Sequence, residues 1–529
     1  MQNKGIAFLF LSCIACVSVF SQSPVKYRVY FKNKANQQFD PYAYFDQKAI
    51  ERRLKQGLPL SDSTDFPVNL LYLRELEQRV ETLKTHSRWL NAAVVMATPE
   101  QIASVSTLPF VSGIEQASSV VCLPATRDDE SLPPLKKEEE MQRQIERMGA
   151  SVLQAEGIHG KGVRIAIFDV GFSGADQHPA FAHLFQKQQI KGTRDFVKNR
   201  DYVYEGGWHG TAVWSCIAGK NPEGRWLGLA MDAEFLLART ELERSEPFAE
   251  EEYWVAAAEW ADKNGADIIN SSLGYTDTRY FPEQMNGKTS FISRGANMAA
   301  RKGMLVVNAA GNEGSGDWGI IGAPADADSV LAVGGLEPCC DYHIDFSSFG
   351  PTADKRLKPN VAAQGRTFSA KASGFSTVDG TSFASPLMAG FAACMWQKYP
   401  ELKNMELFKL LEQSGHLYPY FDYAHGYGLP HASRFNANST APEPTFELVK
   451  DTATSGLKVL IKQSYFDSTA AESSQLLYIS EVDNRNHLIA YRVVEVSSLE
   501  PYSFNYNPFN PISRLRLHYK GYTFEQAIP

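Results

Sequence analysis

The chain contains little cysteine, with 7 cysteines among 529 residues. Two of them lie in an N-terminal apolar segment, and the remaining five are too few for a disulfide-built scaffold and odd in number. We expect Cys216 and Cys394 to be small buried residues of helices. Cys339 and Cys340 could pair with other cysteines in an oxidising compartment, but the sequence leaves their connectivity open.

An excess of positive charge is also missing. The chain has 52 Lys and Arg against 60 Asp and Glu, which gives a formal net charge of −8 at pH 7. A domain that binds a polyanion is normally basic, so nucleic acid is not expected as a partner. The hydrophobic fraction of 44% is typical of a globular protein, and the length indicates more than one domain.

Long apolar runs are absent beyond the N-terminus. The run Ile6–Phe20 follows Lys4 and is shorter than the roughly 20 residues that a membrane span requires. It predicts an export signal over residues 1–21, although Cys16 leaves lipidation as an alternative. We therefore expect a secreted or cell-envelope protein, extracellular or periplasmic, with no stable membrane span once the signal is removed.

Three common enzyme motifs are missing as well. The chain has no Gly-Xaa-Ser-Xaa-Gly elbow of an α/β-hydrolase and no His-Glu-Xaa-Xaa-His metalloprotease motif. Gly157, Gly160 and Gly162 precede the apolar run Val163–Phe168, whereas glycines that bind a dinucleotide follow their strand. The sequence therefore argues against these three enzyme families.

Strand and helix patterns alternate from about residue 145 to 436. Five apolar runs are typical of strands buried on both faces: Val163–Phe168, Phe235–Ala238, Asp267–Ser271, Met304–Ala309 and Val330–Val333. Helical segments lie between them, for example Tyr253–Asn264, closed by Gly265, and Phe291–Lys302, closed by Gly303. This alternation predicts a parallel sheet with helices on both faces, and active sites of such sheets form at the carboxyl ends of the strands.

The flanking regions have other patterns. Residues 25–117 are typical of a small α+β domain, with strands at Lys26–Phe31 and Ala92–Met96. Between them, five apolar residues recur at helical spacing: Leu70, Leu73, Leu76, Val80 and Leu83. A polar, proline-bearing stretch at Cys122–Met141 indicates an exposed linker that proteases can cut. Short alternating runs after residue 441 predict a small all-β module: Leu457–Ile461, Leu476–Ile479 and Leu515–Tyr519.

Three segments hold an Asp, a His and a Ser in chain order: Ala166–Gly171, Trp208–Thr211 and Gly380–Pro386. A serine hydroxyl is protonated at neutral pH, so it needs a base and an orienting carboxylate before it can attack an acyl carbon. Asp169, His209 and Ser382 supply these groups. Singly, each has an ordinary alternative: the Asp can cap a helix or bind a ribose or metal, the His can begin a helix, and the Ser can be an N-cap.

Together the three segments resemble the signatures of the subtilases, the subtilisin-like serine peptidases. Ala309–Asn312 resembles the oxyanion-hole segment of that family, and Ser272-Leu273-Gly274 resembles the strand that lines its substrate cleft. Phe346–Pro351 and Gly426–Gly428 are similar to further family landmarks. The resemblance implies an α/β, subtilisin-like catalytic domain with a mostly parallel sheet, a small α+β propeptide before it and a small all-β domain after it.

The resemblance also assigns roles and boundaries. It implies catalytic roles for Asp169, His209, Ser382 and Asn312, and substrate-binding roles for Ser272, Leu273, Gly274 and Gly311. The domains would be a signal peptide (1–21), a propeptide-like domain (22–121), a linker with the maturation site (122–145), a peptidase domain (146–437) and a β-rich domain (438–529). The function implied is a secreted serine endopeptidase made as a zymogen, whose partners are protein or peptide substrates and its own propeptide.

Two positions depart from the family pattern, and two alternatives stay open. Tyr275 stands where many members have a glycine, and it either reshapes the pocket for the P1 side chain or begins a surface insertion. Phe383 replaces the usual Met. No cofactor and no catalytic metal is expected, but structural calcium is possible at Asp277, Asp326 and Asp328, which could equally be solvated surface charges. The rival function is a catalytically silent subtilase scaffold that acts as a secreted binding protein.

Overall fold

The computed structural model describes residues 23–35, 37–117, 144–243, 247–435, 442–450, 456–465, 475–485, 487–496, 500–504 and 514–527. The expected signal peptide with Cys16, and nearly all of the expected linker with Cys122, lie outside these residues. The chain divides into two compact units, which are described separately.

The first unit is a four-stranded sheet in the order β2-β3-β1-β4 with two helices. Its elements are β1 (Val25–Phe31), α3 (Leu70–Glu77), β2 (Thr82–Ser87), β3 (Ala92–Ala97), α4 (Pro99–Ser106) and β4 (Val111–Ala117). β1 is central and pairs antiparallel with both β3 and β4. The helical periodicity expected to continue to Leu83 ends at Glu77, because Leu83 belongs to β2, which pairs with β3.

Residues 36–67 group with the second unit. They contain α1 (Pro41–Tyr44) and α2 (Gln47–Gln56). Asp40 and Asp46 cap these helices by accepting hydrogen bonds from the backbone N–H of Tyr42 and Lys48 at 2.9 Å each. We call residues 37–67 the arm. The α+β pattern of the sequence did not separate the arm from the strands on either side of it.

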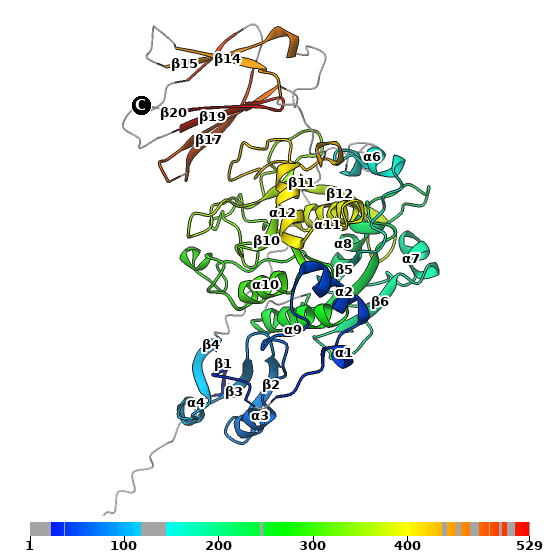
Figure 1. The fold of residues 1–529 in the computed structure, drawn as a ribbon, viewed down its shortest axis with the longest axis vertical. Helices are drawn as coiled ribbons and strands as arrows, with labels where there is room; N and C mark the ends of the chain where they lie inside the picture. The colour runs from blue at the N-terminus through cyan, green and yellow to red at the C-terminus, as the bar shows by residue number, and fades with distance from the viewer. Residues whose placement is uncertain are drawn as a thin grey trace, which may run out of the picture. The chain divides into compact units, whose positions relative to one another are not determined.

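The second unit is built on a seven-stranded sheet in the order β11-β10-β9-β8-β5-β7-β6. Figure 1 labels β5, β6, β10 and β11 of this sheet. Every neighbouring pair in it is parallel. Its strands are β5 (Arg164–Asp169), β6 (Ile190–Asp195), β7 (Glu234–Arg239), β8 (Ile268–Ser271), β9 (Leu305–Ala309), β10 (Val330–Leu336) and β11 (Val361–Gln364). The parallel sheet expected from the apolar runs is confirmed.

Helices and short elements connect these strands. The helices are α6 (Ala150–Ala155), α7 (Ala182–Gln186), α8 (His209–Ala218), α9 (Ala249–Lys263), α10 (Phe291–Arg301), α11 (Thr381–Lys398) and α12 (Asn404–Gln413). A hairpin of β12 (Arg366–Ala370) and β13 (Phe375–Asp379) precedes α11, and single 3₁₀ turns occur at Pro179–Phe181, Pro282–Gln284 and Ala432–Phe435. In the described part of the chain, no helix is both long and apolar enough to cross a membrane.

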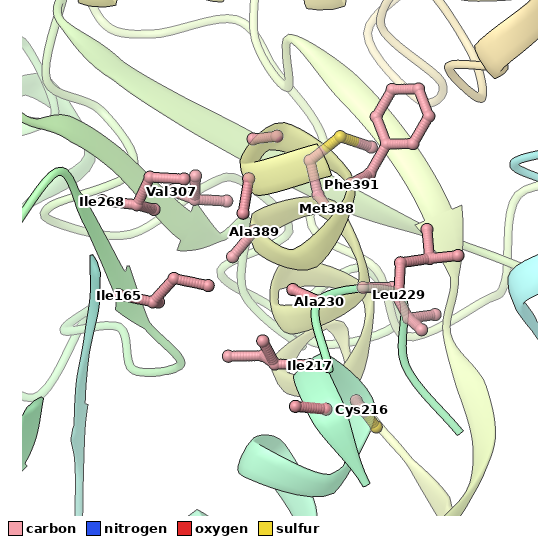
Figure 2. Packing of buried hydrophobic residues seen from close by; sticks show 14 of the residues in the cluster. Ile165, Cys216, Ile217, Leu229, Ala230, Ile268, Val307, Met388, Ala389 and Phe391 are labelled. Carbon is pink, nitrogen blue, oxygen red and sulfur yellow. The ribbon is translucent and has the colours of Figure 1, made fainter. Parts of the chain in front are cut away.

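Different helices cover the two faces of the sheet, and successive residues of a strand pack against opposite faces. Ile165 and Ile167 of β5 pack into the core with α8 and α11, whereas Ala166 and Phe168 pack into the core with α9 and α10. Figure 2 shows the first core, where Ile165, Ile268 and Val307 of three neighbouring strands lie beside Ala389 of α11. Full burial on both faces accounts for the continuous apolar runs in the sequence.

The C-terminal strands form two antiparallel sheets, in the orders β14-β15-β18 and β17-β16-β19-β20. They are β14 (Phe446–Lys450), β15 (Leu457–Ile461), β16 (Leu476–Val482), β17 (Leu488–Glu495), β18 (Tyr502–Phe504), β19 (Arg514–Tyr519) and β20 (Tyr522–Ala527), with a 3₁₀ turn at Gln463–Tyr465. Both sheets contribute to one apolar cluster. The expected all-β module is confirmed.

Two of the cysteine expectations can be compared with the structure. Cys216 in α8 and Cys394 in α11 are buried free thiols, as expected. Cys339 and Cys340 are bonded to each other and not to a distant cysteine.

Candidate functional site

The carboxyl edge of the parallel sheet gathers the residues singled out from the sequence. Asp169 ends β5, Ser272 follows the last residue of β8, and Asn312 follows β9 by three residues. His209 is the first residue of α8, and Ser382 is in the first turn of α11. A cleft of about 400 Å³ is lined by His209, Ser272, Leu273, Gly274, Gly311, Asn312 and Ser382. Asp169 is buried, with 1% of its surface exposed.

Asp169 and His209 form a close pair. Nδ1 of His209 lies 2.9 Å from Oδ1 and 3.1 Å from Oδ2 of Asp169. The backbone N–H of Val170 also donates to Oδ1 at 2.8 Å and so fixes the carboxylate. Gly210 lets the start of α8 approach this closely, since a Cβ there would lie 2.3 Å from the carbonyl oxygen of Gly171. The glycine after the histidine is therefore a steric requirement of the pair.

The carboxylate changes the proton affinity of the imidazole. Burial alone would lower the pKa of His209, but the charge of Asp169 and its hydrogen bond outweigh burial and raise the pKa above its ordinary value. An Nδ1–H that donates to the carboxylate leaves Nε2 as the basic nitrogen.

Ser382 lies beside this pair. The imidazole of His209 is 5.3 Å, between ring centroids, from the ring of Phe383, the next residue after the serine. The Ser382 hydroxyl donates to the carbonyl oxygen of Ser272 at 3.1 Å. A hydroxyl has one proton, so Ser382 must leave this acceptor in order to donate to Nε2 of His209. Hydrogen bonds of catalytic groups commonly tighten only when substrate is bound.

A proline inside α11 explains part of the local geometry. Pro386 has no N–H, so the carbonyl oxygen of Ser382 lacks its helical donor. The hydroxyl of Ser272 donates to that oxygen at 2.9 Å instead. Asn270 in turn donates to the Ser272 hydroxyl at 3.2 Å and accepts from Ser385 at 2.9 Å. This chain of bonds ties the first turn of α11 to the end of β8.

Asn312 is held by the residue before the serine. Its Oδ1 accepts from both the N–H and the hydroxyl of Thr381, at 2.9 Å each. The same hydroxyl accepts from the N–H of Gly311 at 3.2 Å. With Oδ1 engaged in this way, the NH₂ group of Asn312 is the part of the amide available to a ligand. Gly311 has φ of 116°, and a Cβ there would lie 2.7 Å from the hydroxyl of Ser348.

Tyr275 forms part of the cleft wall and is 2% exposed, so its side chain is placed to shape the cleft. Its backbone pairs with Ala323 in an antiparallel bridge, with N···O distances of 2.9 and 3.1 Å. The guanidinium of Arg279 stacks 3.5 Å above its ring. By contrast, a Cβ on Gly274 would meet nothing within 4 Å, so the backbone is open to the cleft there.

The three calcium candidates do not form a cluster. Asp326 is buried and accepts from Ser293 and from the N–H of Gly287, while Asp328 is exposed near Arg356. Among the residues that the structure describes, no group of three or more His, Cys, Asp or Glu side chains could hold a metal ion.

A buried Asp–His pair with a serine beside it can activate the hydroxyl as a nucleophile, which is the arrangement of a serine hydrolase. The sequence profile of the Subtilase family matches residues 160–428, which is more than half of the chain. A second profile, Peptidase S8 propeptide domain, Bacteroidota, matches residues 26–131. The chain therefore belongs to the subtilase family, and it is a serine-type endopeptidase with a propeptide domain, hence a zymogen.

Two curated subtilisins agree with this assignment. The chain is 32% identical to subtilisin DY of Bacillus licheniformis over 259 residues, which are 49% of this chain and 85% of that protein. It is 30% identical to subtilisin Savinase of Lederbergia lenta over 263 residues, 50% of this chain and 87% of that protein. Among solved structures, Sphericase has a TM-score of 0.44 at 26% identity and covers 52% of this chain and 92% of its own.

Two hydrogen-bonding roles in the site were not anticipated. Thr381 positions both Asn312 and Gly311, and the hydroxyl of Ser272 replaces the missing donor of Pro386. Both residues stand inside segments that the sequence had marked. Their partners, however, are 69 to 110 residues away, and local pattern does not reveal such contacts.

We predict that the pKa of His209 depends on Asp169. In a Ser382→Ala background the imidazole should titrate above its ordinary range. Asp169→Asn should bring the pKa below that range, because burial then acts without the carboxylate. An NMR titration of the histidine ring protons measures both values, and an unchanged pKa in Asp169→Asn would contradict the assigned cause.

We also predict a coupling between Ser272 and Pro386. Ser272→Ala, again with Ser382→Ala, should lower the free energy of unfolding by about 1–3 kcal/mol, because the Ser382 carbonyl loses its donor. Adding Pro386→Ala restores a backbone N–H and should recover part of this loss. Denaturant unfolding of the single and double variants measures the coupling, and strictly additive effects would show that the two residues do not share one acceptor.

Proposed function

We propose that this subtilase hydrolyses peptide bonds through an acyl-enzyme formed on Ser382. The observation that carries the proposal is the Asp169–His209 pair at the same sheet edge as Ser382. Nε2 of His209 takes the hydroxyl proton as Oγ attacks the carbonyl carbon, and then delivers this proton to the leaving amine. Water repeats the sequence in the second half-reaction and releases the acid. Asp169 holds the tautomer and stabilises the imidazolium.

The oxyanion of each tetrahedral intermediate would bind the side-chain NH₂ of Asn312 and the backbone N–H of Ser382. The hydrogen bonds from Thr381 support this role because they orient the amide before substrate arrives. Ser382 stands in the first turn of α11, where the helix dipole favours negative charge. These steps use side-chain and backbone groups of the chain and require no cofactor.

The protonation state of His209 sets the acid limit of this mechanism. A protonated imidazole cannot accept the serine proton, so activity falls as pH decreases through the pKa of His209. Because Asp169 raises that pKa, the fall occurs at a higher pH than an isolated histidine would give.

We further propose that the enzyme is secreted, or held in the cell envelope, and that it is matured by a cut in the linker of residues 122–145. The export signal read in residues 1–21 and the match to an S8 propeptide domain support this order of events. The catalytically silent scaffold is the weaker alternative, since a binding protein has no use for an oriented Asp169–His209 pair.

The charge of the cleft suggests a substrate class. Its lining includes the carboxylates of Glu241, Glu243, Glu250 and Glu313, and the described lining contains no Lys or Arg. One of these carboxylates, Glu250, is paired with Arg279 at 3.0 Å. We propose that substrates with a lysine or arginine near the scissile bond are preferred.

For the mechanism, a fluorophosphonate probe should label the matured parent at Ser382 and should not label Ser382→Ala. His209→Ala should lower kcat by several orders of magnitude with the fold intact, since the three residues act as a unit. Asn312→Ala should lower kcat by about 10²–10³-fold, the loss measured for such a donor in subtilisin. Near-parental turnover in His209→Ala would rule the mechanism out, and an unlabelled, correctly matured parent would favour the binding scaffold.

For the substrate class, kcat/KM should be higher for a lysine peptide than for its norleucine isostere. Glu313→Gln should reduce the ratio of the two kcat/KM values, lysine over norleucine, by up to about 5-fold, the range expected for one partly exposed charge. In the parent enzyme, about 0.5 M salt should also reduce this ratio. Equal kcat/KM values for the two peptides at low salt would refute the proposed preference and would leave the proposed mechanism unaffected.

A further inference from the structure

The amino edge of the central sheet, opposite the candidate catalytic site, carries the arm. Asp46 of the arm donates its backbone N–H to the carbonyl oxygen of Lys263 at 2.9 Å, and Lys48 donates to that of Gly162 at 2.6 Å and pairs with Asp267 at 2.9 Å. Lys263 is the last residue of α9, and Gly162 and Asp267 precede β5 and β8. Ser272 and Asp169, in contrast, stand at the carboxyl ends of β8 and β5. At about 3.3 Å per residue, the six residues of β5 separate the two edges by roughly 16 Å.

Arg52 of α2 is the centre of this contact and is 2% exposed. Its guanidinium donates to the carbonyl oxygens of Lys302 and Asp262 at 3.3 Å each, and to that of Ala266. It also pairs with the carboxylate of Asp262. Asp262 lies in the last turn of α9 and Lys302 is the C-cap of α10. The last carbonyls of a helix lack intrahelical donors and favour a cation.

The neighbouring charges complete a balanced set. Arg53 pairs with Asp262 at 2.7 Å and with Asp65 at 3.0 Å. Lys302 pairs with Asp65 at 2.9 Å and with Asp62 at 3.0 Å. The side chains of Arg53, Asp65 and Lys302 are each at most 3% exposed. Three cations and three carboxylates therefore meet where most of them are out of water. Such a set is stable only while all its members are present.

The ends of α9 and α10 fit the arm in shape as closely as they do in charge. Gly265 and Gly303 end α9 and α10 with φ of 73° and 88°. A Cβ on Gly265 would lie 2.8 Å from Cβ of Lys48, and a Cβ on Gly303 would lie 2.7 Å from Cγ of Gln56. A side chain at either position would collide with the arm.

We propose that the C-terminal ends of α9 and α10 form an arginine-binding docking site remote from the cleft, and that its occupant is the arm of the propeptide. The arm precedes the linker, so a cut in the linker separates it covalently from the site but breaks none of these contacts. The propeptide then remains on the processed enzyme until Arg52 and Arg53 leave the site. Its release is governed by this edge of the sheet.

The test uses the whole chain with Ser382→Ala, so that it rests on the propeptide assignment and not on the proposed triad. A recognition sequence for a site-specific protease is placed in the linker, the purified precursor is cut, and release of the N-terminal fragment is followed after dilution. We expect the parent fragment to dissociate slowly. Arg52→Ala should dissociate at least about 30-fold faster, because the buried carboxylate of Asp262 loses one of its two arginine partners and the helix-end carbonyls lose their cation.

Control variants separate this contact from general destabilisation. Glu51→Ala, at an exposed position of the same helix, should change the rate by less than about 2-fold. Asp262→Ala should also accelerate release. The acceleration in the double variant Arg52→Ala/Asp262→Ala should be smaller than the product of the two single accelerations, because both substitutions remove the same interaction. If the uncut Arg52→Ala precursor does not fold, Arg52→Lys serves instead. It keeps the charge but presents its donors from a single nitrogen, whereas three nitrogens of Arg52 reach Lys302, Ala266 and Asp262, so about tenfold faster release is expected.

Parental release rates in a folded Arg52→Ala or Arg52→Lys precursor would overturn the proposal, as would strictly multiplicative effects of Arg52→Ala and Asp262→Ala. Loss of fluorophosphonate labelling in the active enzyme would bear only on the proposed mechanism, because the release experiment contains no active serine.

Discussion

The parallel direction of all seven strands in the central sheet is the constraint on which the rest of this molecule depends. Parallel strands end at a common edge, so residues that follow β5, β8 and β9 must come together however far apart they are in the chain. Asp169, Ser272 and Asn312 are neighbours for this reason. Two-sided burial of the strands keeps the edge rigid, because each strand residue is packed against one of two helical layers.

Rigidity alone would not position Ser382, which enters the edge from a helix. Here the chain uses a deficiency. Pro386 removes one helical donor, and the hydroxyl of Ser272 fills the vacancy across 110 residues. The hydroxyl of Thr381 makes two bonds: it donates to Oδ1 of Asn312 and accepts from the N–H of Gly311. Ser382 is thus tied to the end of β8, and Asn312 to the start of α11, by hydrogen bonds that a change in helix position would break.

These relations explain what could be predicted from the sequence. The strands were predictable because burial on both faces leaves a continuous apolar run in the sequence. An acid or amide at the end of such a run can therefore be recognised from the sequence alone. The periodicity through Leu83 was misleading, because a strand that pairs with β3 can carry a leucine at a helical interval. The packing of the arm could not be predicted from the sequence, because it depends on tertiary contacts. Arg52 and Arg53 look like the solvated face of an amphipathic helix, and only the tertiary structure supplies the carboxylates and carbonyls that allow their burial.

The common direction of the strands also accounts for the different chemistry of the two edges of the sheet. In a parallel α/β layer the helices run against the strands, so helix N-termini gather at the carboxyl edge and helix C-termini at the amino edge. The first edge offers unpaired N–H groups and suits the negative charge that develops on an acyl oxygen near Ser382. The second offers unpaired carbonyls and suits a buried cation, and Arg52 occupies it. A propeptide that presents arginines to the amino edge therefore uses a property that the sheet already has. It can be held there without competing for the groups that bind substrate.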